Sequence, residues 1–466
     1  MAKLYIFGIG GTGSRVLRSF TMMMAAGVKL DAQEIVPIII DPDHANADLT
    51  RTVMLMNSYQ SIHNELTFPD NNPSTFFKTS INKRLPNYTL RIDDTEDKSF
   101  KQFIGLSSMD RENQAMARML FSEKNLNSNM EVGFKGNPNI GSVVLNQIVN
   151  SDDFEEFANS FEQGDKIFII SSIFGGTGAS GFPLLLKTLR QGSSFPNNDI
   201  INKAEIGAIT VLPYFNLQVD NDSEIDSSTF ISKTKSALAY YEENISKNKQ
   251  INALYYLADN MKNTYENHEG GIDQQNDAHL IEFLASTAII DFCNNEHLDT
   301  VNKELGIQDI NDVVSFPSFY DNITDMVRKP LTQFCLMANC FAYKKSYISS
   351  TELNANNKGI GLEVYSSTFG KNLFVYFSLF TQWLNEMKSN KRSLDLFNVG
   401  SGATKPFDVV TGVKPKKVVS FLSDYDLFFD RINAAVTKCT TTDSKNKLVE
   451  TFYRGTETLV KEKFNF

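Results

Sequence analysis

Short runs of consecutive hydrophobic residues alternate with longer amphipathic segments through roughly the first 260 residues of the chain. The runs lie at residues 4–7, 35–40, 166–171, 206–212 and 253–257. Uninterrupted hydrophobic runs of this length are typical of parallel strands that are buried on both faces. Hydrophobic positions at helical spacing occupy the segments between them, at residues 14–26, 143–161, 183–190 and 230–243. The alternation of the two patterns predicts βαβ units and a parallel sheet.

The remaining segments follow other patterns. Residues 45–130 are polar and rich in Asn and Asp, which predicts an insertion with helices of its own. Residues 276–293 form a long apolar-rich helical pattern. Beyond it, helical patterns at 324–343, 371–387 and 424–436 are mixed with strand-like pieces at 362–365 and 418–422. We therefore expect an α/β protein: a Rossmann-like parallel-sheet domain over 1–273, a long central helix over 274–298 and an α+β C-terminal domain over 299–466.

Composition narrows the class of protein. The 466 residues carry 45 Lys and Arg against 55 Asp and Glu, a net charge of −10, so we expect no direct nucleic-acid partner. No window approaches the ~18 apolar residues of a membrane-spanning helix, and the N-terminus enters a strand pattern without a secretory signal. The four cysteines form no C-x-x-C pair and the five histidines no H-E-x-x-H motif. We expect a cytoplasmic protein in which no metal is held by protein ligands alone.

The first candidate site follows the first predicted strand. The turn Gly8-Ile9-Gly10-Gly11-Thr12-Gly13 leads directly into a predicted helix. Glycines in such a turn allow positive φ and close backbone approach, and the turn directs free N–H groups at an anion. Asp41 and Asp43 end the second strand, where a dinucleotide-binding fold places an acid for a ribose hydroxyl. We therefore expect this turn and Asp41 to contact a nucleotide.

Two more glycine-rich turns follow along the chain. Residues 175–181, G-G-T-G-A-S-G, come after a buried strand and before a helix. Residues 133–141, G-F-K-G-N-P-N-I-G, also precede a helix, although an ordinary surface turn would have the same pattern. Two phosphate-type loops in one sheet suit a nucleotide held at both ends of its phosphate chain, whereas a Rossmann dehydrogenase needs only one.

In this order, the three loops resemble those of the tubulin/FtsZ family of GTPases. G-I-G-G-T-G is similar to the family's first loop, G-N-P-N-I-G to the G-A-N-P-x-x-G loop of FtsZ, and F-G-G-T-G-A-S-G-F-P to the G-G-G-T-G-T/S-G signature. The resemblance continues through L-P-Y-F at 212–215, L-A-D-N at 257–260 and N-D at 276–277, and covers roughly residues 3–300 apart from the insertion. It implies a protein that binds GTP and GDP with Mg²⁺, hydrolyses GTP and assembles head-to-tail with itself, with an adaptor protein as a further partner.

The resemblance also implies roles for individual residues. Backbone N–H groups of the first and second loops would bind the phosphates. Two asparagines would read guanine, because an amide both donates and accepts hydrogen bonds, although Asn also caps helices and strands. The implied cofactor-binding residues are Gly10, Gly11, Thr12, Asp41, Asn137, Gly175, Gly176, Thr177, Gly178, Ala179, Asn260 and Asn276.

In this family, acids of the next subunit complete GTP hydrolysis from an N-x-D-x-x-D/E loop after the central helix. Asn294-Asn295-Glu296-His297-Leu298-Asp299 has that spacing. Glu296 and Asp299 are therefore the implied catalytic residues, which would polarise water beside the γ-phosphate. Here Glu296 replaces an Asp and the loop's usual glycine is missing. Asp321 and Asp325 form an alternative pair, and surface acids at a helix end would look the same.

The second signature also departs from the family pattern. Phe174 and Ser180 replace its first and last glycines. No Gly-Lys-Ser/Thr motif is present, so the chain is not a P-loop protein. Magnesium would then be held by the phosphates and at most one acid.

Three other interpretations stay open. An E1/ThiF-like ATP-dependent adenylating enzyme also opens with G-x-G-G-x-G-S and an acidic D-x-D, but it usually adds C-x-x-C pairs. An NAD-binding Rossmann protein would leave the loop at 175–181 unexplained. A tubulin-like scaffold that binds GTP without hydrolysing it fits the altered loop at 294–299. The sequence does not choose among cytoskeletal, DNA-positioning and defence roles.

Overall fold

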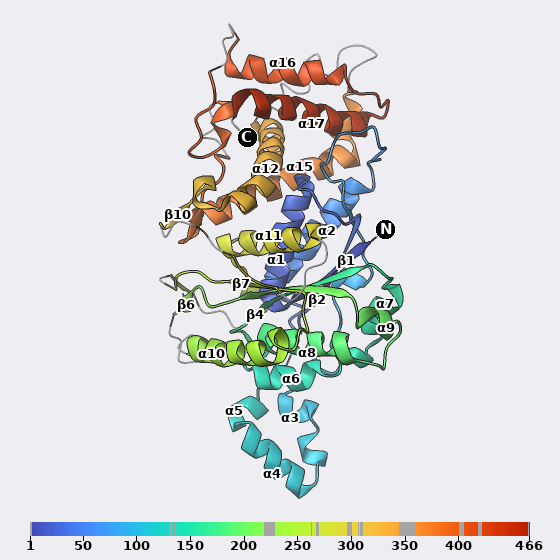
Figure 1. Ribbon diagram of the computed structural model, residues 1–466, viewed down its shortest axis with the longest axis vertical. Helices are drawn as coiled ribbons and strands as arrows, with labels where there is room; N and C mark the ends of the chain where they lie inside the picture. The colour runs from blue at the N-terminus through green and yellow to red at the C-terminus, as the bar shows by residue number, and fades with distance from the viewer. Residues whose placement is uncertain are drawn as a thin grey trace.

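A parallel sheet of seven strands lies at the centre of the computed structural model (Figure 1). The structure describes residues 2–130, 133–134, 136–218, 229–261, 263–266, 270–295, 301–305, 307, 311–343, 360–399, 405–417, 422–464 and 466. The strand order is β3-β2-β1-β4-β5-β7-β9, and each neighbouring pair is parallel. The strands are β1 (Lys3–Ile9), β2 (Glu34–Ile40), β3 (Ser80–Ile81), β4 (Lys166–Ser172), β5 (Glu205–Val211), β7 (Ala253–Leu257) and β9 (Val301–Leu305). The predicted parallel-sheet α/β fold is confirmed.

The uninterrupted hydrophobic runs in the sequence have a direct structural reason. In β1, β2, β4 and β5 every residue except the first is buried. A strand that helices cover on both faces cannot alternate hydrophobic and polar positions, because neither side meets water.

Helices cover both faces of this sheet (Figure 1). One face carries α1 (Gly10–Ala25), α2 (Ala47–His63) and α11 (Leu280–Asn294). The other face carries α6 (Pro138–Leu145), α7 (Asp152–Ser160), α8 (Gly176–Gln191), α9 (Asn198–Ile201) and α10 (Phe230–Tyr241). Outside the main sheet, β6 (Asn216–Leu217) pairs in parallel with β8 (Thr264–Tyr265).

The central helix begins later than predicted. We expected it from residue 274, but α11 begins at Leu280. Its start is set by the side chain of His279, whose Nδ1 accepts a hydrogen bond from Ile281 N at 3.0 Å. Asn276 therefore lies in the loop before the helix. Thirteen of the 15 residues of α11 are buried, because the helix lies between the sheet and the C-terminal helices.

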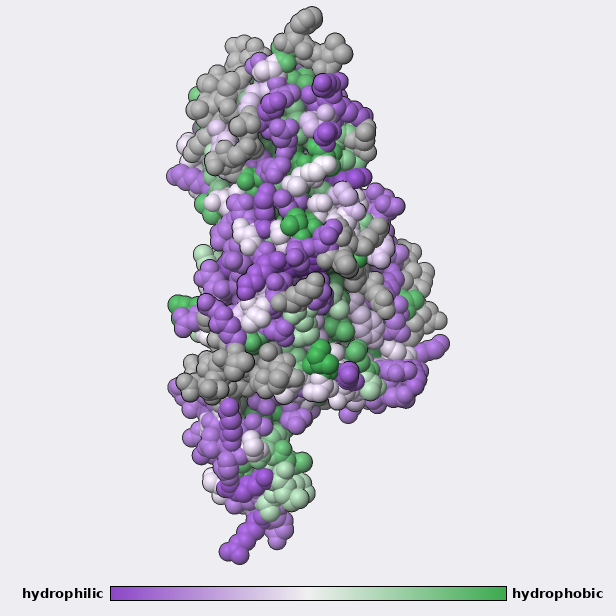
Figure 2. All heavy atoms as spheres, turned by 90° about the vertical axis from the view of Figure 1, so that its left-hand side faces the viewer, coloured by the Kyte–Doolittle hydropathy of each residue, from purple (hydrophilic) through white to green (hydrophobic). Residues whose placement is uncertain are grey.

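The predicted insertion at 45–130 is shorter in the structure. α2 packs against α1, and β3 pairs with β2, so this part of the segment belongs to the main body. Only the later part projects, as an arm that contains α3 (Phe100–Phe103), α4 (Arg111–Leu120) and α5 (Glu123–Leu126) (Figure 1). The arm exposes Met116, Met119 and Leu120, and Figure 2 shows hydrophobic surface along one side of it.

The C-terminal region is dominated by helices. They are α12 (Asp321–Tyr343), α14 (Glu363–Ser366), α15 (Thr368–Ser389), α16 (Asp424–Val436) and α17 (Ser444–Lys463). The described strands here are β10 (Val313–Val314) and β11 (Ser393–Leu394), which pair in parallel. Residues 362–365, predicted as a strand, are instead the N-cap and the first three residues of α14, and α17 was not predicted. Residues 418–421 of the second strand-like piece lie outside the described residues.

The C-terminal helices share a hydrophobic core with the sheet domain. Tyr376 of α15 is fully buried, stacks edge-on against Phe77 at 5.0 Å and donates a hydrogen bond to Thr21 O of α1. Trp383, also on α15, stacks on Phe283 of α11 at 6.3 Å.

Among the described residues, no helix combines the length and apolar character needed to span a membrane.

Candidate functional site

A cavity of about 600 Å³ lies at the carboxyl ends of β1 and β4. The strand order reverses between these two strands, because β2 and β3 lie on one side of β1 and β4 lies on the other. Open α/β sheets bind ligands at such a point, and this volume is in the range of small-molecule sites. Of the predicted cofactor-binding residues, Gly10, Gly11, Thr12, Asp41, Gly175, Gly176, Thr177, Gly178 and Asn276 line the cavity.

The three glycine-rich turns meet at this cavity. A Cβ atom added to Gly10 would lie 3.4 Å from Thr177 Cβ. One added to Gly176 would lie 3.0 Å from Gly136 N, and one added to Gly133 would lie 3.9 Å from Thr177 Oγ1. Segments that are far apart in the sequence therefore form one surface, in which the second loop touches both of the others.

Three helices begin at this surface without side-chain caps. α1 begins at Gly10, α8 at Gly176 and α6 at Pro138, and none has a side-chain cap hydrogen bond or an acidic residue in its first turn. By contrast, Asn46 caps α2 and Ser151 caps α7. Uncapped N-termini leave backbone N–H donors and the positive end of the helix dipole available for an anion.

Two glycines are required by the geometry of the first turn. Gly10 has φ +69°, a conformation that L side chains rarely adopt. Gly13 lies so close to β1 that a Cβ atom would stand 2.3 Å from the carbonyl carbon of Gly8. The spacing of glycines in this turn thus allows α1 to begin directly beside the end of β1.

The departures from the family signature have local reasons. Phe174 is buried in an aromatic cluster beside the cavity, with ring centroids 5.7 Å from Phe215 and 4.9 Å from Phe230. Ser180 lies in α8, where its hydroxyl donates to Gly176 O at 2.7 Å. A Cβ atom on Gly141 of α6 would stand 2.2 Å from Ser180 Oγ, so these two small residues let α6 and α8 pack closely.

Acidic residues outnumber cations in the described lining of the cavity. The acids are Asp41, Asp43, Asp48, Glu266 and Asp277, and the cations are Arg15 and Lys391. Asp43 accepts a hydrogen bond from Gly271 N at 2.7 Å. The described residues contain no cluster of three or more His, Cys, Asp or Glu side chains that could hold a metal ion.

Asp41 is the acid most affected by its surroundings. Burial raises the pKa of Asp41 to about 7. The hydrogen bond that its carboxylate accepts from Asp43 N acts in the opposite direction but is the smaller effect. Because the folded state binds this proton more tightly than the unfolded state, Asp41 lowers the free energy of unfolding as pH rises from about 4 to 7.

We predict that Asp41→Asn removes this pH dependence. Relative to the variant, the wild type should lose up to about 4 kcal/mol between pH 4 and pH 8, at ~1.4 kcal/mol per pKa unit. Urea unfolding at several pH values measures the difference. Asp70→Asn, at an exposed turn, is the control and should follow the wild type. A constant difference between Asp41→Asn and wild type across this range would contradict the prediction.

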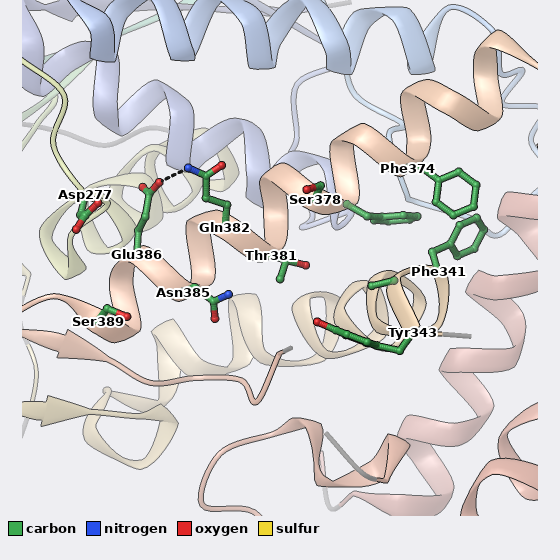
Figure 3. Close-up of a pocket in the computed structure, with 12 residues that line it drawn as sticks. Asp277, Phe341, Tyr343, Phe374, Ser378, Thr381, Gln382, Asn385, Glu386 and Ser389 are labelled. Carbon is green, nitrogen blue, oxygen red and sulfur yellow. Dashed lines mark hydrogen bonds between the residues drawn. The ribbon is translucent and has the colours of Figure 1, made fainter. Parts of the chain in front are cut away.

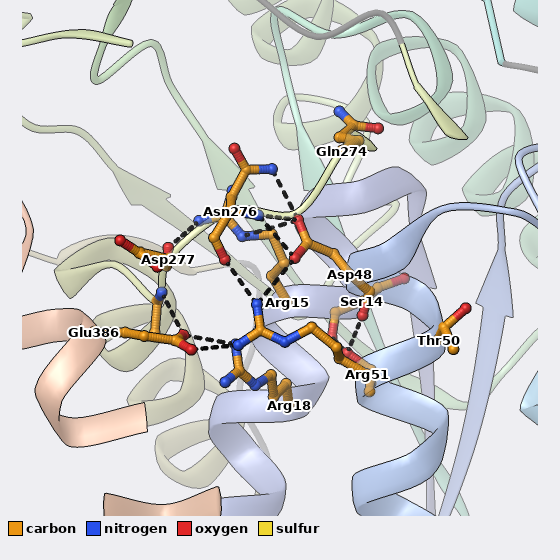
Figure 4. A network of polar contacts seen from close by, with 12 residues as sticks. Ser14, Arg15, Arg18, Asp48, Thr50, Arg51, Gln274, Asn276, Asp277 and Glu386 are labelled. Atoms are coloured by element: carbon orange, nitrogen blue, oxygen red, sulfur yellow. Dashed lines mark hydrogen bonds and ion pairs between the residues drawn. The ribbon is translucent and has the colours of Figure 1, made fainter. Parts of the chain in front are cut away.

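Asn276 belongs to a partly buried polar network beside the cavity (Figure 4). Its side-chain Nδ2 donates to Asp48 Oδ2 at 2.8 Å, so one of its amide donors is already used. Arg15 forms an ion pair with Glu282 of α11 and donates to Asp277 O at 3.0 Å. His279, the N-cap of α11, also lines the cavity. Burial lowers the pKa of its imidazole to about 3, so the ring is neutral at pH 7.

Other predicted residues are not part of the described lining. Asn137 and Ala179 neighbour it, as the N-cap of α6 and within the first turns of α8. Asn260 is exposed, and its backbone N–H bonds the side chain of Asp259. Glu296 and Asp299 lie outside the described residues. The alternative pair, Asp321 and Asp325, is exposed at the start of α12 and does not line the cavity.

Sequence reasoning missed several residues of the lining. Arg15 follows the first loop by less than one helical turn and could have been found from that spacing. Tyr265, Ser389, Asn390 and Lys391 also line the cavity. The last three come from the end of α15 and the residues directly after it, and no local pattern in the sequence connects them with the glycine loops.

Fold and site together define a parallel-sheet α/β protein in which three glycine-rich turns meet at one cavity, at the carboxyl edge of the sheet. No family model matches the chain, and no curated protein matches it either. Solved structures with similarity include "CetZ2 from Haloferax volcanii - GTPgS bound protofilament" (12% identity, TM-score 0.27) and "CetZ1 from Haloferax volcanii - GDP bound monomer" (14% identity, TM-score 0.28). CetZ from Methanosaeta thermophila strain DSM 6194 is also similar (16% identity, TM-score 0.25). Each match covers 55% of this chain and, in the same order, 49%, 51% and 46% of the solved chain, so only about half of each solved structure is matched.

Proposed function

We propose that the chain is a tubulin/FtsZ-like protein that binds GTP and GDP and hydrolyses GTP when copies assemble head-to-tail. The observation that carries the proposal is the meeting of three glycine-rich turns at one cavity. A single glycine turn is common in nucleotide-binding folds, but the three turns in this order are what the family resemblance predicts. An adenylating enzyme or an NAD-binding protein leaves the second of these turns without a role.

In this proposal the phosphates lie against the N-termini of α1 and α8. Backbone N–H groups of Gly10, Gly11 and Thr12 and of the turn 175–178 would donate to the phosphate oxygens. Asp41 lies beside this position, and a magnesium ion would be shared between it and the phosphates. The base would lie toward Asn276, where one amide N–H and the amide oxygen are not used by Asp48.

Hydrolysis requires a group that polarises the attacking water. We propose that Glu296 and Asp299 supply it from a neighbouring copy, as the family resemblance implies. Asp321 and Asp325 are a weaker choice, because Asp321 already stabilises the N-terminus of α12 through its charge.

A nucleotide panel tests the proposal. GTP and GDP should stabilise the purified chain in thermal unfolding, by about 2.7 kcal/mol at 100 times Kd, whereas ATP and NAD should not. Light scattering should then rise with GTP, and phosphate release should follow it. Glu296→Ala and Asp299→Ala should slow phosphate release without loss of binding. Stabilisation by ATP or NAD alone would overturn the proposal, and binding with scattering but without phosphate release would support the non-hydrolysing scaffold.

A further inference from the structure

The cavity is completed by the C-terminal region of the same chain. Ser389, the last residue of α15, and the next two residues, Asn390 and Lys391, line the cavity together with the glycine loops. Lys391 Nζ donates to Thr264 O and lies 5.1 Å from the ring centroid of Tyr265, which also lines the cavity. The C-terminal region therefore contacts the site directly.

The end of α15 holds the backbone of Ala278 from both sides. Glu386 Oε2 accepts a hydrogen bond from Ala278 N at 3.0 Å. Asn390 Nδ2 donates to Ala278 O at 3.2 Å, while its Oδ1 accepts from the hydroxyl of Tyr265 at 2.7 Å. Asn276, Asp277 and His279, which flank Ala278, line the cavity. Two side chains of α15 and its following loop thus fix the position of one wall.

Glu386 also joins this wall to α1 and α2 (Figure 4). It forms ion pairs with Arg18 of α1, at 3.0 Å, and with Arg51 of α2. Arg51 in turn donates to Asn276 O at 3.1 Å. Burial acts to raise the pKa of Glu386, but the two arginines outweigh it and hold the pKa below its ordinary value. The carboxylate therefore stays charged and keeps all of these contacts at neutral pH.

This part of α15 also borders a second cavity. This cavity of about 650 Å³ lies between α15 and the end of α12, lined by Ser378, Gln382 and Asn385 among others (Figure 3). It shares Asp277 and Ser389 with the first cavity. Glu386, which does not line the first cavity, lines this second one.

We propose that Glu386 and Asn390 are positioning residues of the nucleotide site, which couple its occupancy to the docking of α15. The inference rests on the proposed function, because it takes GTP as the ligand. Coupling of this kind is reciprocal: if α15 positions the wall for GTP, then GTP must stabilise the docked position of α15. Glu386 does not line the nucleotide cavity, so any effect of its substitution on affinity is transmitted through Ala278 and the arginines.

Glu386→Gln tests the proposal, because it keeps the shape of the side chain and removes its charge. We expect the Kd for GTP to rise about 5- to 20-fold, within the usual range of coupling between sites, and Glu386→Asp to recover part of the affinity.

In the wild type, GTP should slow amide hydrogen exchange in the last turns of α15 and change the fluorescence emission of Trp383, the single tryptophan of the chain. Both responses should be lost in Glu386→Gln. Glu462→Gln, which removes an ion pair with Arg431 between α16 and α17, is the matched control and should behave as wild type.

The outcomes separate this proposal from the proposed function. A folded Glu386→Gln variant with unchanged Kd, together with α15 exchange that ignores GTP, would overturn the coupling while GTP binding stands. If the wild type binds no GTP, the test is amide hydrogen exchange of residues 276–279 in the absence of nucleotide. Faster exchange in Glu386→Gln than in the wild type would support the positioning role, and equal exchange in the two proteins would overturn it. Should Glu386→Gln fail to fold, Asn390→Asp keeps the bond from Tyr265, removes the one to Ala278 and should weaken GTP binding in the same way.

Discussion

Gly11→Asp should abolish GTP binding without unfolding the protein. Gly11 lies in the first turn of α1 and lines the cavity, and a Cβ atom there would meet no protein atom within 4 Å. A carboxylate at this position would interact favourably with the N-terminus of the helix, by about 0.3–1 kcal/mol. The same carboxylate would repel the phosphates that we place there, which costs several kcal/mol. We expect Kd for GTP to rise at least ~100-fold, or about 3 kcal/mol.

Two comparisons make this result specific. Gly11→Ala adds only a methyl group and should weaken binding less than Gly11→Asp. Ser444→Asp adds the same charge to the first turn of α17, away from the cavity, and should leave Kd unchanged. Isothermal titration gives the three affinities, and urea unfolding shows that the variants are folded. Wild-type affinity in Gly11→Asp would show that no phosphate lies at the N-terminus of α1.

Arg15→Leu should strongly lower the free energy of unfolding. The guanidinium lies between α1 and α11 and pairs with Glu282, whose side chain is only 3% exposed, and it lies 3.9 Å from Asp48. Burial acts to lower the pKa of Arg15, but Glu282 and its other neighbours raise it, so the guanidinium is charged. Burial raises the pKa of Glu282, against the nearby arginines, which lower it. Removing one partner leaves a buried carboxylate without its cation, and we expect a loss of about 3–5 kcal/mol in the free energy of unfolding.

The double variant Arg15→Leu with Glu282→Leu separates the charge from the packing. It should recover much of the loss, because hydrophobic side chains of similar size replace a buried ion pair at little cost. Arg118→Leu, which removes an exposed ion pair with Glu123 on the arm, should change stability by about 1 kcal/mol or less. Equal losses in the single and double variants would show that the ion pair does not stabilise the contact between α1 and α11.

Local patterns identified most of the sheet domain and its loops. The runs at 4–7 and 166–171 predicted β1 and β4 because a strand buried on both faces has no polar positions to interrupt it. The glycines of the first turn were equally readable, since Gly10 needs a positive φ and Gly13 needs to be small. Those requirements are properties of a few consecutive residues, and the sequence expresses them directly.

Predictions failed where neighbours in space override the local pattern. Residues 47–81 are polar enough to look like an insertion, yet α2 and β3 belong to the main body because Tyr59 and Ile81 are buried within it. The start of α11 was predicted too early, because the apolar pattern does not show that His279 caps the helix. Asn260 follows β7, but it does not line the cavity.

By itself, the sequence determined the parallel sheet, the three glycine turns and their order along the chain. Only the tertiary structure decided that these turns share one surface and that the end of α15 closes it. The physical reason is the range of the interactions: backbone conformation depends on neighbouring residues, whereas Ala278 is held by Glu386 and Asn390, 108 and 112 residues later, through bonds that exist only once the helices have packed.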